Sequence, residues 1–185
     1  MIKHTIFALG IGMSLIFLYL IQYTGAFKNV TIGTDTRGPF VLIYKNYTGP
    51  YHKILSTIEI AEKWAKDNSV DCKYTFGEYF DNPEIVEEGR LRARAGCLIE
   101  KLDQQKMAEL KKITLPTDFI IEEYPSKKMV IALFTGSPGI GPYKVYPKAA
   151  EYIKLNKYTK IGSVIEKYEV LDQKAMNTTY MWPIE

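Results

Sequence analysis

The sequence predicts an α+β domain in which a β-α-β-β unit occurs twice, the two copies forming one pseudo-two-fold antiparallel sheet with both helices on one face. Two observations lead to this fold class. Strand and helix patterns follow the same order in two halves of the chain, and the halves share a turn motif and a strand motif. A third observation, an uncharged apolar segment near the N-terminus, predicts one transmembrane helix before the domain.

The N-terminal segment has the length and composition of a membrane anchor. No residue from Thr5 to Tyr23 is charged. A spanning helix needs about 20 apolar residues, whereas the core of a secretory signal has about 7–15 and precedes a cleavage site of small residues. Residues 24–26 fit such a site only in part. We therefore expect a retained single-pass anchor, or an uncleaved signal, over residues 1–26 and the domain over residues 27–185. A signal that is cleaved near residue 26 is the alternative, and the side of the membrane is left open.

Composition and charge narrow the function classes. Hydrophobic residues make up 46% and charged residues 24% of the chain, as in ordinary globular domains. The net charge of +3 is small and the lysines are scattered. We expect no nucleic-acid partner, because the sequence shows neither a basic stripe nor a helix-turn-helix region.

The first half of the domain reads strand, helix, strand, strand. Residues 40–47 are rich in β-branched and aromatic side chains and lead into a Thr-Gly-Pro-Tyr turn, which predicts a strand. Apolar side chains then recur at helical spacing over residues 51–67. Two further strands are expected at residues 73–80 and 91–99, joined by the acidic loop 81–89.

The second half repeats that order after an amphipathic segment, 103–112, and an extended piece, 118–124. A continuous apolar run, a helical pattern and two strand patterns follow. These four elements are expected at residues 129–134, 143–156, 161–170 and 178–184.

Two short motifs relate the halves to each other. The turn at residues 47–53 matches residues 134–144, where Pro-Tyr-Lys follows an insertion. Residues 76–80 match residues 164–168, because both read apolar, x, Glu, x, aromatic. This alignment makes the two glutamates, Glu78 and Glu166, equivalent and supports an internal duplication.

The two cysteines, Cys72 and Cys97, are too few for a metal site and form no CxxC motif. If residues 72–80 and 91–99 pair as an antiparallel hairpin, the cysteines lie almost opposite each other. A disulfide in an oxidising compartment and two reduced, packed cysteines are both compatible with this position.

Two carboxylates are the candidate binding groups. Residues i and i+2 of a strand face the same side, so Glu166 shares a face with Tyr168, and Glu78 shares one with two phenylalanines. A carboxylate among aromatic side chains suits an apolar cation, since the rings add stacking and cation–π contact. The alternative is an ion pair on a partly solvated face. We favour that alternative for Glu78, with Arg92 or Arg94 as partner, and leave it open for Glu166.

Other chemistry finds little support in the sequence. His4 and His52 are the only histidines, which leaves almost nothing for a Ser-His-Asp or Cys-His site. The glycine-rich segment 136–141 lacks the Gly-Lys-Ser/Thr ending of a phosphate-binding loop. We expect no metal and no cofactor, and a binding protein rather than an enzyme.

The duplicated order, the Thr-Gly-Pro-Tyr turn and the strand with Glu166 and Tyr168 resemble the GyrI-like small-molecule-binding domain, which also forms the effector-binding half of AraC- and MerR-type regulators. The resemblance covers residues 28–185. The apolar N-terminus and the stretches 79–83 and 92–96 are similar to a membrane-anchored, testis-expressed ER-phagy receptor type of this family. That type carries its autophagy motif in a C-terminal extension, so an ER-phagy function is not carried over to this sequence.

The resemblance implies a cleft between the two repeats, with Glu166 in it. We therefore expect a membrane-tethered module that binds a small apolar or cationic ligand. Glu166 is its expected polar anchor, Tyr47, Tyr143 and Tyr168 are its expected aromatic walls, and Glu78 is a further candidate. Two alternatives stay open: a hydrolase acting on strained electrophilic molecules with Glu166 as general base, and a scaffold that recruits a protein partner.

Overall fold

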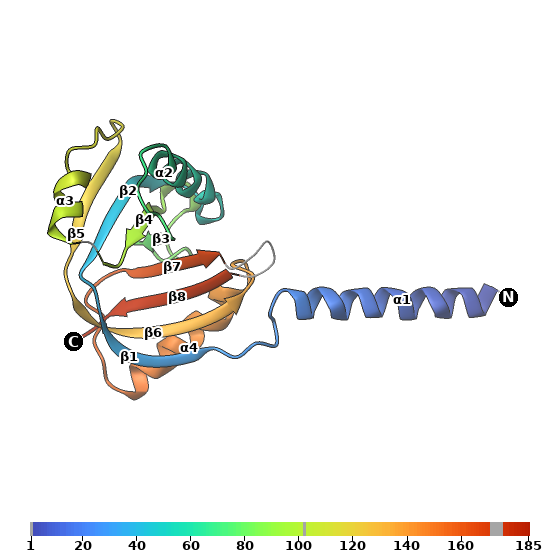
Figure 1. Ribbon diagram of the computed structural model, residues 1–185. Helices are drawn as coiled ribbons and strands as arrows, with labels where there is room; N and C mark the ends of the chain where they lie inside the picture. The colour runs from blue at the N-terminus through green and yellow to red at the C-terminus, as the bar shows by residue number, and fades with distance from the viewer. Residues whose placement is uncertain (1, 102, 171–175) are drawn as a thin grey trace.

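The computed structural model describes residues 2–101, 103–170 and 176–185. It confirms the α+β class, with one eight-stranded antiparallel sheet and α-helices packed on it (Figure 1). In chain order the elements are α1 (Ile2–Tyr23), β1 (Thr31–Arg37), β2 (Phe40–Thr48), α2 (Leu55–Asp67), β3 (Tyr74–Tyr79), β4 (Arg92–Ile99), α3 (Gln104–Leu110), β5 (Phe119–Tyr124), β6 (Lys127–Gly136), α4 (Gly141–Leu155), β7 (Val164–Val170) and β8 (Met176–Pro183), with short 3₁₀ turns at Tyr51–Lys53 and Glu88–Arg90.

The strand order of the sheet shows the duplication directly. The order is β1-β6-β8-β7-β3-β4-β2-β5, so each half contributes the same three-strand pattern and the halves meet where β3 pairs with β7. The two outer strands extend the prediction. β1 precedes β2 in the chain but pairs with β6, whereas β5 precedes β6 but pairs with β2. Each half is therefore completed at its edge by a strand from the other half.

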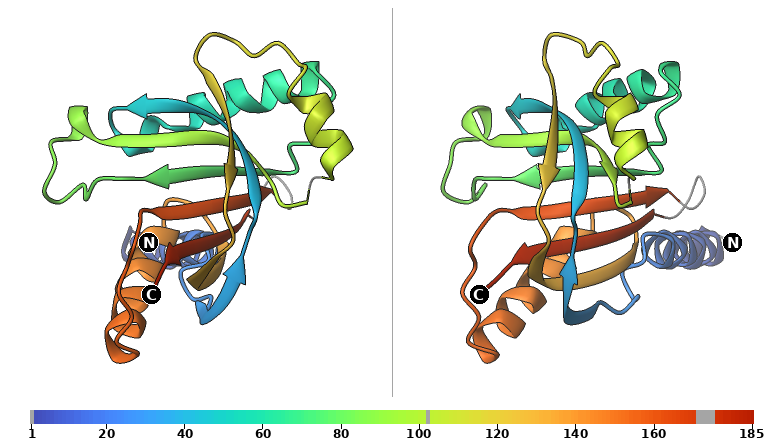
Figure 2. Two further views of the ribbon diagram at one scale, coloured as in Figure 1. Left: turned by 90° about the vertical axis from the view of Figure 1, so that its left-hand side faces the viewer. Right: turned by 60° about the vertical axis from the view of Figure 1, so that its left-hand side comes forward.

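Both principal helices lie on one face of the sheet, as predicted. Their buried positions have the same spacing, which allows the helices to be aligned with each other. Thr57, Ala61 and Ala65 of α2 correspond to Val145, Ala149 and Ile153 of α4. Helix α2 packs on β2 and β4, and α4 packs on β6, so each covers its own half (Figure 2).

The other face of the sheet is concave and holds a core shared by both halves. Phe40 and Leu42 of β2 join Met129 and Ile131 of β6 in one buried cluster, together with Phe76 of β3. This packing requires the sheet to curve strongly, and the strands of the two halves run in clearly different directions in Figure 1. The inner strands of the sheet therefore have one side toward the helices and one toward this concave core.

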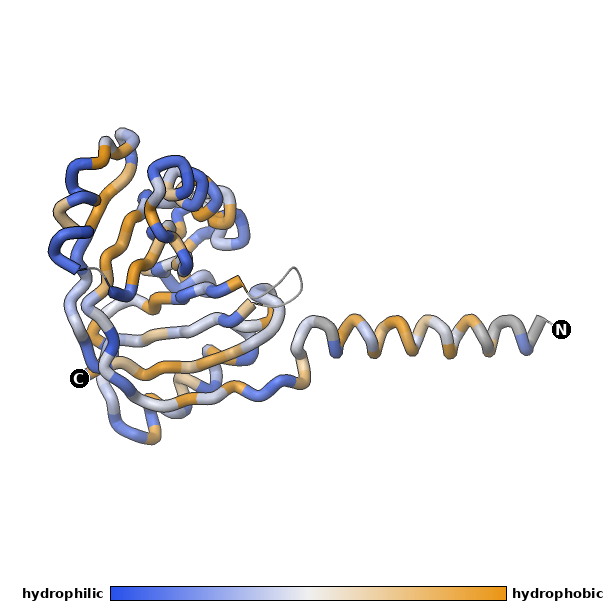
Figure 3. The backbone as a smooth tube through the Cα atoms, in the orientation of Figure 1, coloured by the Kyte–Doolittle hydropathy of each residue, from blue (hydrophilic) through white to orange (hydrophobic). Residues whose placement is uncertain are grey.

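Helix α1 projects away from the sheet (Figure 1), and Figure 3 shows hydrophobic residues along it. The predicted transmembrane span is not supported, because none of the helices in the described part of the chain is long and apolar enough to cross a membrane. The segment after α1 is fixed to the domain. The Ser137 amide donates to the Thr24 carbonyl oxygen at 2.9 Å, and the Lys144 ammonium donates to the carbonyl oxygens of Gly25, Ala26 and Lys28.

Cys72 and Cys97 form a disulfide, with their Cα atoms 5.3 Å apart. The bond links the segment just before β3 to β4, on the side that α2 covers. It decides between the two alternatives that the sequence left open. The hairpin geometry behind the prediction is also observed, since β3 and β4 are antiparallel neighbours.

Candidate ligand-binding site

Glu166 lies at the junction of the two halves, buried under the helix-covered face of the sheet. It sits on β7, and only 5% of it is exposed. Two tyrosine hydroxyls donate to its carboxylate. The Tyr146 hydroxyl, from α4, lies 2.6 Å from Oε1, and the Tyr168 hydroxyl, two residues along β7, lies 3.0 Å from Oε2.

Further tyrosines extend this cluster across both halves. The hydroxyls of Tyr79 on β3 and Tyr168 are 2.8 Å apart. Because Tyr168 uses its hydrogen on Glu166, Tyr79 is the donor to Tyr168. Tyr51 packs edge-on against Tyr79 with ring centroids 4.8 Å apart. Tyr180 on β8 is the direct cross-strand neighbour of Glu166.

The electrostatics of the site follow from its burial. Burial raises the pKa of Glu166 to about 7, although the hydrogen bonds from Tyr146 and Tyr168 act in the opposite direction. Burial, and then the nearby Glu166 charge, raises the pKa values of Tyr79, Tyr146 and Tyr168 above the ordinary tyrosine value. These tyrosines therefore act as neutral hydroxyl donors.

Within residues 2–101, 103–170 and 176–185, Glu166 has no cationic partner. The ion pairs of the described residues include none to Glu166, and its only side-chain hydrogen bonds there come from tyrosines. A buried carboxylate without a compensating cation is costly to ionise. The site is therefore suited to a ligand that brings a positive charge, or to a reaction in which Glu166 takes up a proton.

Glu78 lies in a contrasting environment on the concave face. The Arg94 Nε and the Ser163 hydroxyl both donate to its carboxylate. Arg94 also donates to Glu122 at 2.5 Å and to the Tyr44 hydroxyl at 3.0 Å. Although burial opposes the charge, the two carboxylates raise the pKa of Arg94 above its usual value. Glu78 is therefore held in a complete ion-pair network, as the favoured alternative predicted.

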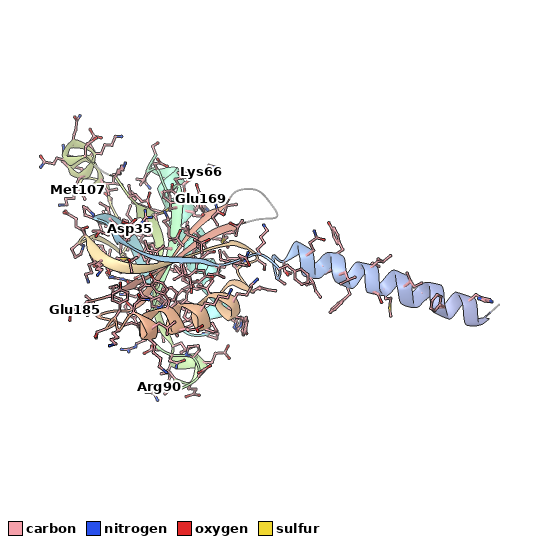
Figure 4. The ribbon with its side chains drawn as sticks, turned by 90° about the horizontal axis from the view of Figure 1, so that it is seen from below. Asp35, Lys66, Arg90, Met107, Glu169 and Glu185 are labelled. Atoms are coloured by element: carbon pink, nitrogen blue, oxygen red, sulfur yellow. A yellow bond between two sulfur atoms is a disulfide. The ribbon has the colours of Figure 1, made fainter. Side chains whose placement is uncertain are left out.

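Surface ion pairs account for much of the remaining charge. Arg92 pairs with Asp81 at 2.7 Å and does not reach Glu78. Asp35 and Glu169, both labelled in Figure 4, pair with Arg37 and Lys73. Groups of three or more residues that could hold a metal ion are absent from the described part of the chain.

The predicted equivalence of Glu78 and Glu166 is wrong by one residue. In the β3–β7 ladder Gly77 lies opposite Glu166, and Glu78 lies opposite Ile165. Successive residues of a strand face opposite sides, so the two glutamates lie on opposite faces of the sheet. When the halves are aligned on the Thr-Gly turns that end β2 and β6, the strand ladders make Gly77 the structural equivalent of Glu166, and Tyr79 the equivalent of Tyr168.

The structure places the predicted aromatic walls differently. Tyr168 contacts Glu166 as expected, but Tyr143 is 84% exposed and takes no part in the cluster. Tyr47 packs in a cluster that includes Tyr168, and its hydroxyl donates to the Pro50 carbonyl oxygen at 2.8 Å, which closes the turn after β2. The structure thus keeps Tyr168 in the site, removes Tyr143 from it, and gives Tyr47 a structural contact near it.

Sequence reasoning missed three members of the cluster. Tyr146 lies within the predicted helix 143–156, and Tyr79 lies inside the repeated strand motif 76–80. Tyr180 stood in a predicted strand with the parity that faces Glu166. The sequence signal for them was periodicity: alternation along a strand for Tyr79 and Tyr180, and helical spacing for Tyr146.

Two surface hollows lie apart from this cluster. One, of about 370 Å³, is lined by Tyr47, Phe80 and Arg92 among others, and the second, of about 340 Å³, is lined by Lys45 and Asp118 among others. Neither is lined by Glu166, which is covered by its own tyrosines. Of the tyrosines around Glu166, Tyr79 and Tyr146 are half-buried, whereas Tyr168 and Tyr180 are buried.

The fold is shared with solved structures. EcmrR in its complex with DNA aligns with a TM-score of 0.62 and 17% identity, over 100% of this chain and 68% of that one. The EcmrR C-terminal domain alone aligns with a TM-score of 0.61 and 16% identity, over 84% of this chain and 98% of that one. A hydrolase from Listeria innocua aligns with a TM-score of 0.52 and 10% identity, over 89% and 98%.

At such low identity these likenesses establish the shared fold alone. They support the predicted GyrI-like fold, but not the ER-phagy receptor type. No protein-family model matches the sequence. No curated protein matches it either.

Proposed function

We propose that this domain binds a small apolar molecule with a positive charge, and that Glu166 is the anchor for that charge. The observation that carries the proposal is a buried carboxylate whose only side-chain partners among the described residues are tyrosine hydroxyls. A bound cation supplies the positive charge that no described residue supplies to Glu166, and the surrounding rings supply apolar and cation–π contact. The resemblance of the sequence to GyrI-like small-molecule-binding domains supports a ligand-binding role, and the fold is shared with the EcmrR C-terminal domain.

Calorimetric titration with tetraphenylphosphonium tests the proposal, with triphenylphosphine oxide as an uncharged control. We expect the wild-type chain to bind the cation in preference to the neutral compound. Glu166→Gln should weaken cation binding about tenfold or more, because a buried charge pair loses one partner. Glu169→Gln is the matched control on the same strand, since Glu169 pairs with surface Lys73. Equal affinity of Glu166→Gln and wild type would contradict the proposal.

Hydrolysis is the second candidate, because a carboxyl with a pKa of about 7 suits a general base at neutral pH. Glu166 would take a proton from water, whose oxygen would attack one carbon of a strained ring such as an epoxide. The ring C–O bond would break, and the Tyr146 hydroxyl would protonate the leaving oxygen. Retained binding of styrene oxide with lost diol formation in Glu166→Gln would favour this candidate. If the chain binds none of these compounds, the tyrosines around Glu166 serve only to pack the core, and the third role, a scaffold that recruits a protein partner, is favoured.

We further propose that α1 attaches the domain to a membrane, with the domain on an oxidising side. Large apolar side chains along α1 are exposed, from 48% for Ile11 to 71% for Phe7. The disulfide supports an oxidising compartment. Flotation with phospholipid vesicles tests the attachment: the wild-type chain should float with the vesicles, and the double variant Leu15→Lys, Leu18→Lys should not. Flotation of both chains alike would contradict this role of α1.

A further inference from the structure

The Tyr180 hydroxyl is buried without a hydrogen-bond partner among the described residues. Tyr180 is 0% exposed. Burial raises the pKa of Tyr180, and the Thr178 hydroxyl, two residues earlier on the same face, lowers it, but the two hydroxyls do not reach regular hydrogen-bond geometry. An unsatisfied buried hydroxyl destabilises a fold, so its presence calls for a reason other than packing.

The fold itself does not need this hydroxyl. Tyr180 lies opposite Glu166 on the neighbouring strand. In the first half, Gly77 takes the place of Glu166, and the residue opposite Gly77 is Ala95. The first half therefore builds the same position with a methyl group. The start of α4 is shaped around the hydroxyl as well, because a Cβ atom on Gly141 would lie 2.1 Å from the Tyr180 oxygen.

Tyr180 lies where it would contact a ligand group that takes the place of the Tyr146 side chain. Its ring contacts the Tyr146 ring edge-on, with centroids 6.0 Å apart, and Tyr146 is one of the two donors to Glu166. A ligand that replaces Tyr146 at the carboxylate therefore enters beside Tyr180. Its charge would face Glu166, and an adjacent oxygen atom would face the free hydroxyl.

We propose that Tyr180 is a second recognition group of this site, donating a hydrogen bond to an acceptor oxygen next to the cationic centre of the ligand. This inference rests on the proposed function and narrows the ligand class to apolar cations that carry a carbonyl or ether oxygen beside the charge. The unsatisfied hydroxyl of the free protein is thus kept for the bound state.

A matched pair of cations tests the assignment. Phenacyltrimethylammonium and 2-phenylethyltrimethylammonium differ only in the carbonyl group next to the charged end. We expect the wild-type chain to prefer the carbonyl compound about tenfold, as one added hydrogen bond implies. Tyr180→Phe should reduce this preference to about twofold or less, while exposed Tyr143→Phe should leave it unchanged. A preference that survives in Tyr180→Phe overturns the proposal.

Stability gives a second readout that does not need a ligand. Because Tyr180→Phe removes an unsatisfied hydroxyl, it should raise the Tm of the free chain by about 2–4 °C. An unchanged or lower Tm overturns the proposal.

Failure of the proposed function is distinguishable: in that case neither cation binds, or both bind Glu166→Gln as tightly as wild type. If both bind wild type equally and Glu166→Gln binds neither, the proposed function stands and the role of Tyr180 is wrong.

Discussion

The two halves of the sheet use the same backbone for two different interiors under their helices. Where β3 meets β7, the first half has Gly77 and the second has Glu166. Opposite these residues on the neighbouring strands lie Ala95 in the first half and Tyr180 in the second. The first half is therefore apolar at this place, while the second is polar.

The helices repeat this contrast. The alignment of their buried positions makes Ile58 of α2 the equivalent of Tyr146 of α4. Both halves have a tyrosine two residues further along the same strand and on the same face: Tyr79 follows Gly77, and Tyr168 follows Glu166. The hydroxyls of these two tyrosines share a hydrogen bond. Since the first half folds with apolar side chains at these positions, the polar set of the second half is not a requirement of the fold. This difference is the strongest structural reason to assign function to Glu166.

The concave face reverses the contrast, because there the first half carries the buried charge. Arg94 neutralises Glu78 and Glu122, and the side chains of Arg94 and Glu78 are only 13% and 6% exposed. Arg94→Met leaves Glu78 as an unpaired buried carboxylate and should lower the free energy of unfolding by about 3–5 kcal/mol. Urea denaturation measures the change.

Arg92→Met is the control for that prediction. Arg92 pairs with Asp81, which lies just after β3, but the Arg92 side chain is 67% exposed. Its loss should change the free energy of unfolding far less than the loss of Arg94, because solvent screens an exposed pair. Equal effects of the two substitutions would mean that the Arg94 network is no more buried than a surface pair.

Glu166→Gln should stabilise the domain at high pH, in contrast to Arg94→Met. The pKa of Glu166 rises from an ordinary 4.5 to about 7 on folding. Between these pH values the folded state holds the proton and the unfolded state does not, so wild-type stability falls as pH rises and the loss is complete above about 7. The substitution should therefore raise stability by up to about 3 kcal/mol at pH 8 and by almost nothing at pH 4.

Urea denaturation of both chains at pH 4 and pH 8 checks this prediction. Glu169→Gln, at the surface of the same strand, should show no comparable difference between the two pH values. Equal stability of Glu166→Gln and wild type at pH 8 would show that Glu166 ionises as readily in the folded chain as in the unfolded one.

Gly77→Ala tests why the first half has no side chain at the position where the second half has Glu166. A Cβ atom at Gly77 would lie 2.7 Å from the Tyr79 hydroxyl oxygen, which donates to Tyr168. The substitution should lower the free energy of unfolding by about 1–3 kcal/mol, because the Tyr79 ring must shift. Gly33→Ala on β1 is the control, since a Cβ atom there meets nothing within 4 Å. A Tm unchanged by Gly77→Ala would contradict the assigned packing.

Tyr143→Ala should have the smallest effect. Its ring is 84% exposed, so both the free energy of unfolding and cation affinity should stay within about 0.5 kcal/mol of wild type. Tyr146→Phe, three residues along α4, provides the comparison. It removes a hydrogen bond to the ionised carboxylate and should raise the pKa of Glu166 further, which carboxyl-carbon NMR titration can follow.

Local sequence patterns predicted most of the fold but not the faces of its strands. The expected strands and helices lie where predicted because their apolar periodicity is strong, as in residues 129–134. β1 was missed because Thr31–Arg37 is mostly polar and owes its place to pairing with distant β6. Local patterns carry no information about such a partner.

The residues around Glu166 were predicted only in part, for two geometric reasons. Aligning Glu78 with Glu166 by residue type shifted the strands by one position, which reverses the face. Aligning Pro142-Tyr143 with Pro50-Tyr51 fixed the start of the helix rather than its buried face, so Tyr143 was named in place of Tyr146. Register and helix rotation are set by tertiary packing, which one sequence does not display.

The pH dependence of tetraphenylphosphonium affinity tests the central claim most directly, because this cation does not itself titrate. Calorimetry from pH 5 to pH 9 should show affinity rising about tenfold per pH unit up to pH 7 and then levelling off, as Glu166 loses its proton. Glu166→Gln should bind weakly at every pH. A wild-type affinity that is flat across this range, or a Glu166→Gln curve that follows the wild-type one, would contradict the assignment of Glu166 as the charge-binding group.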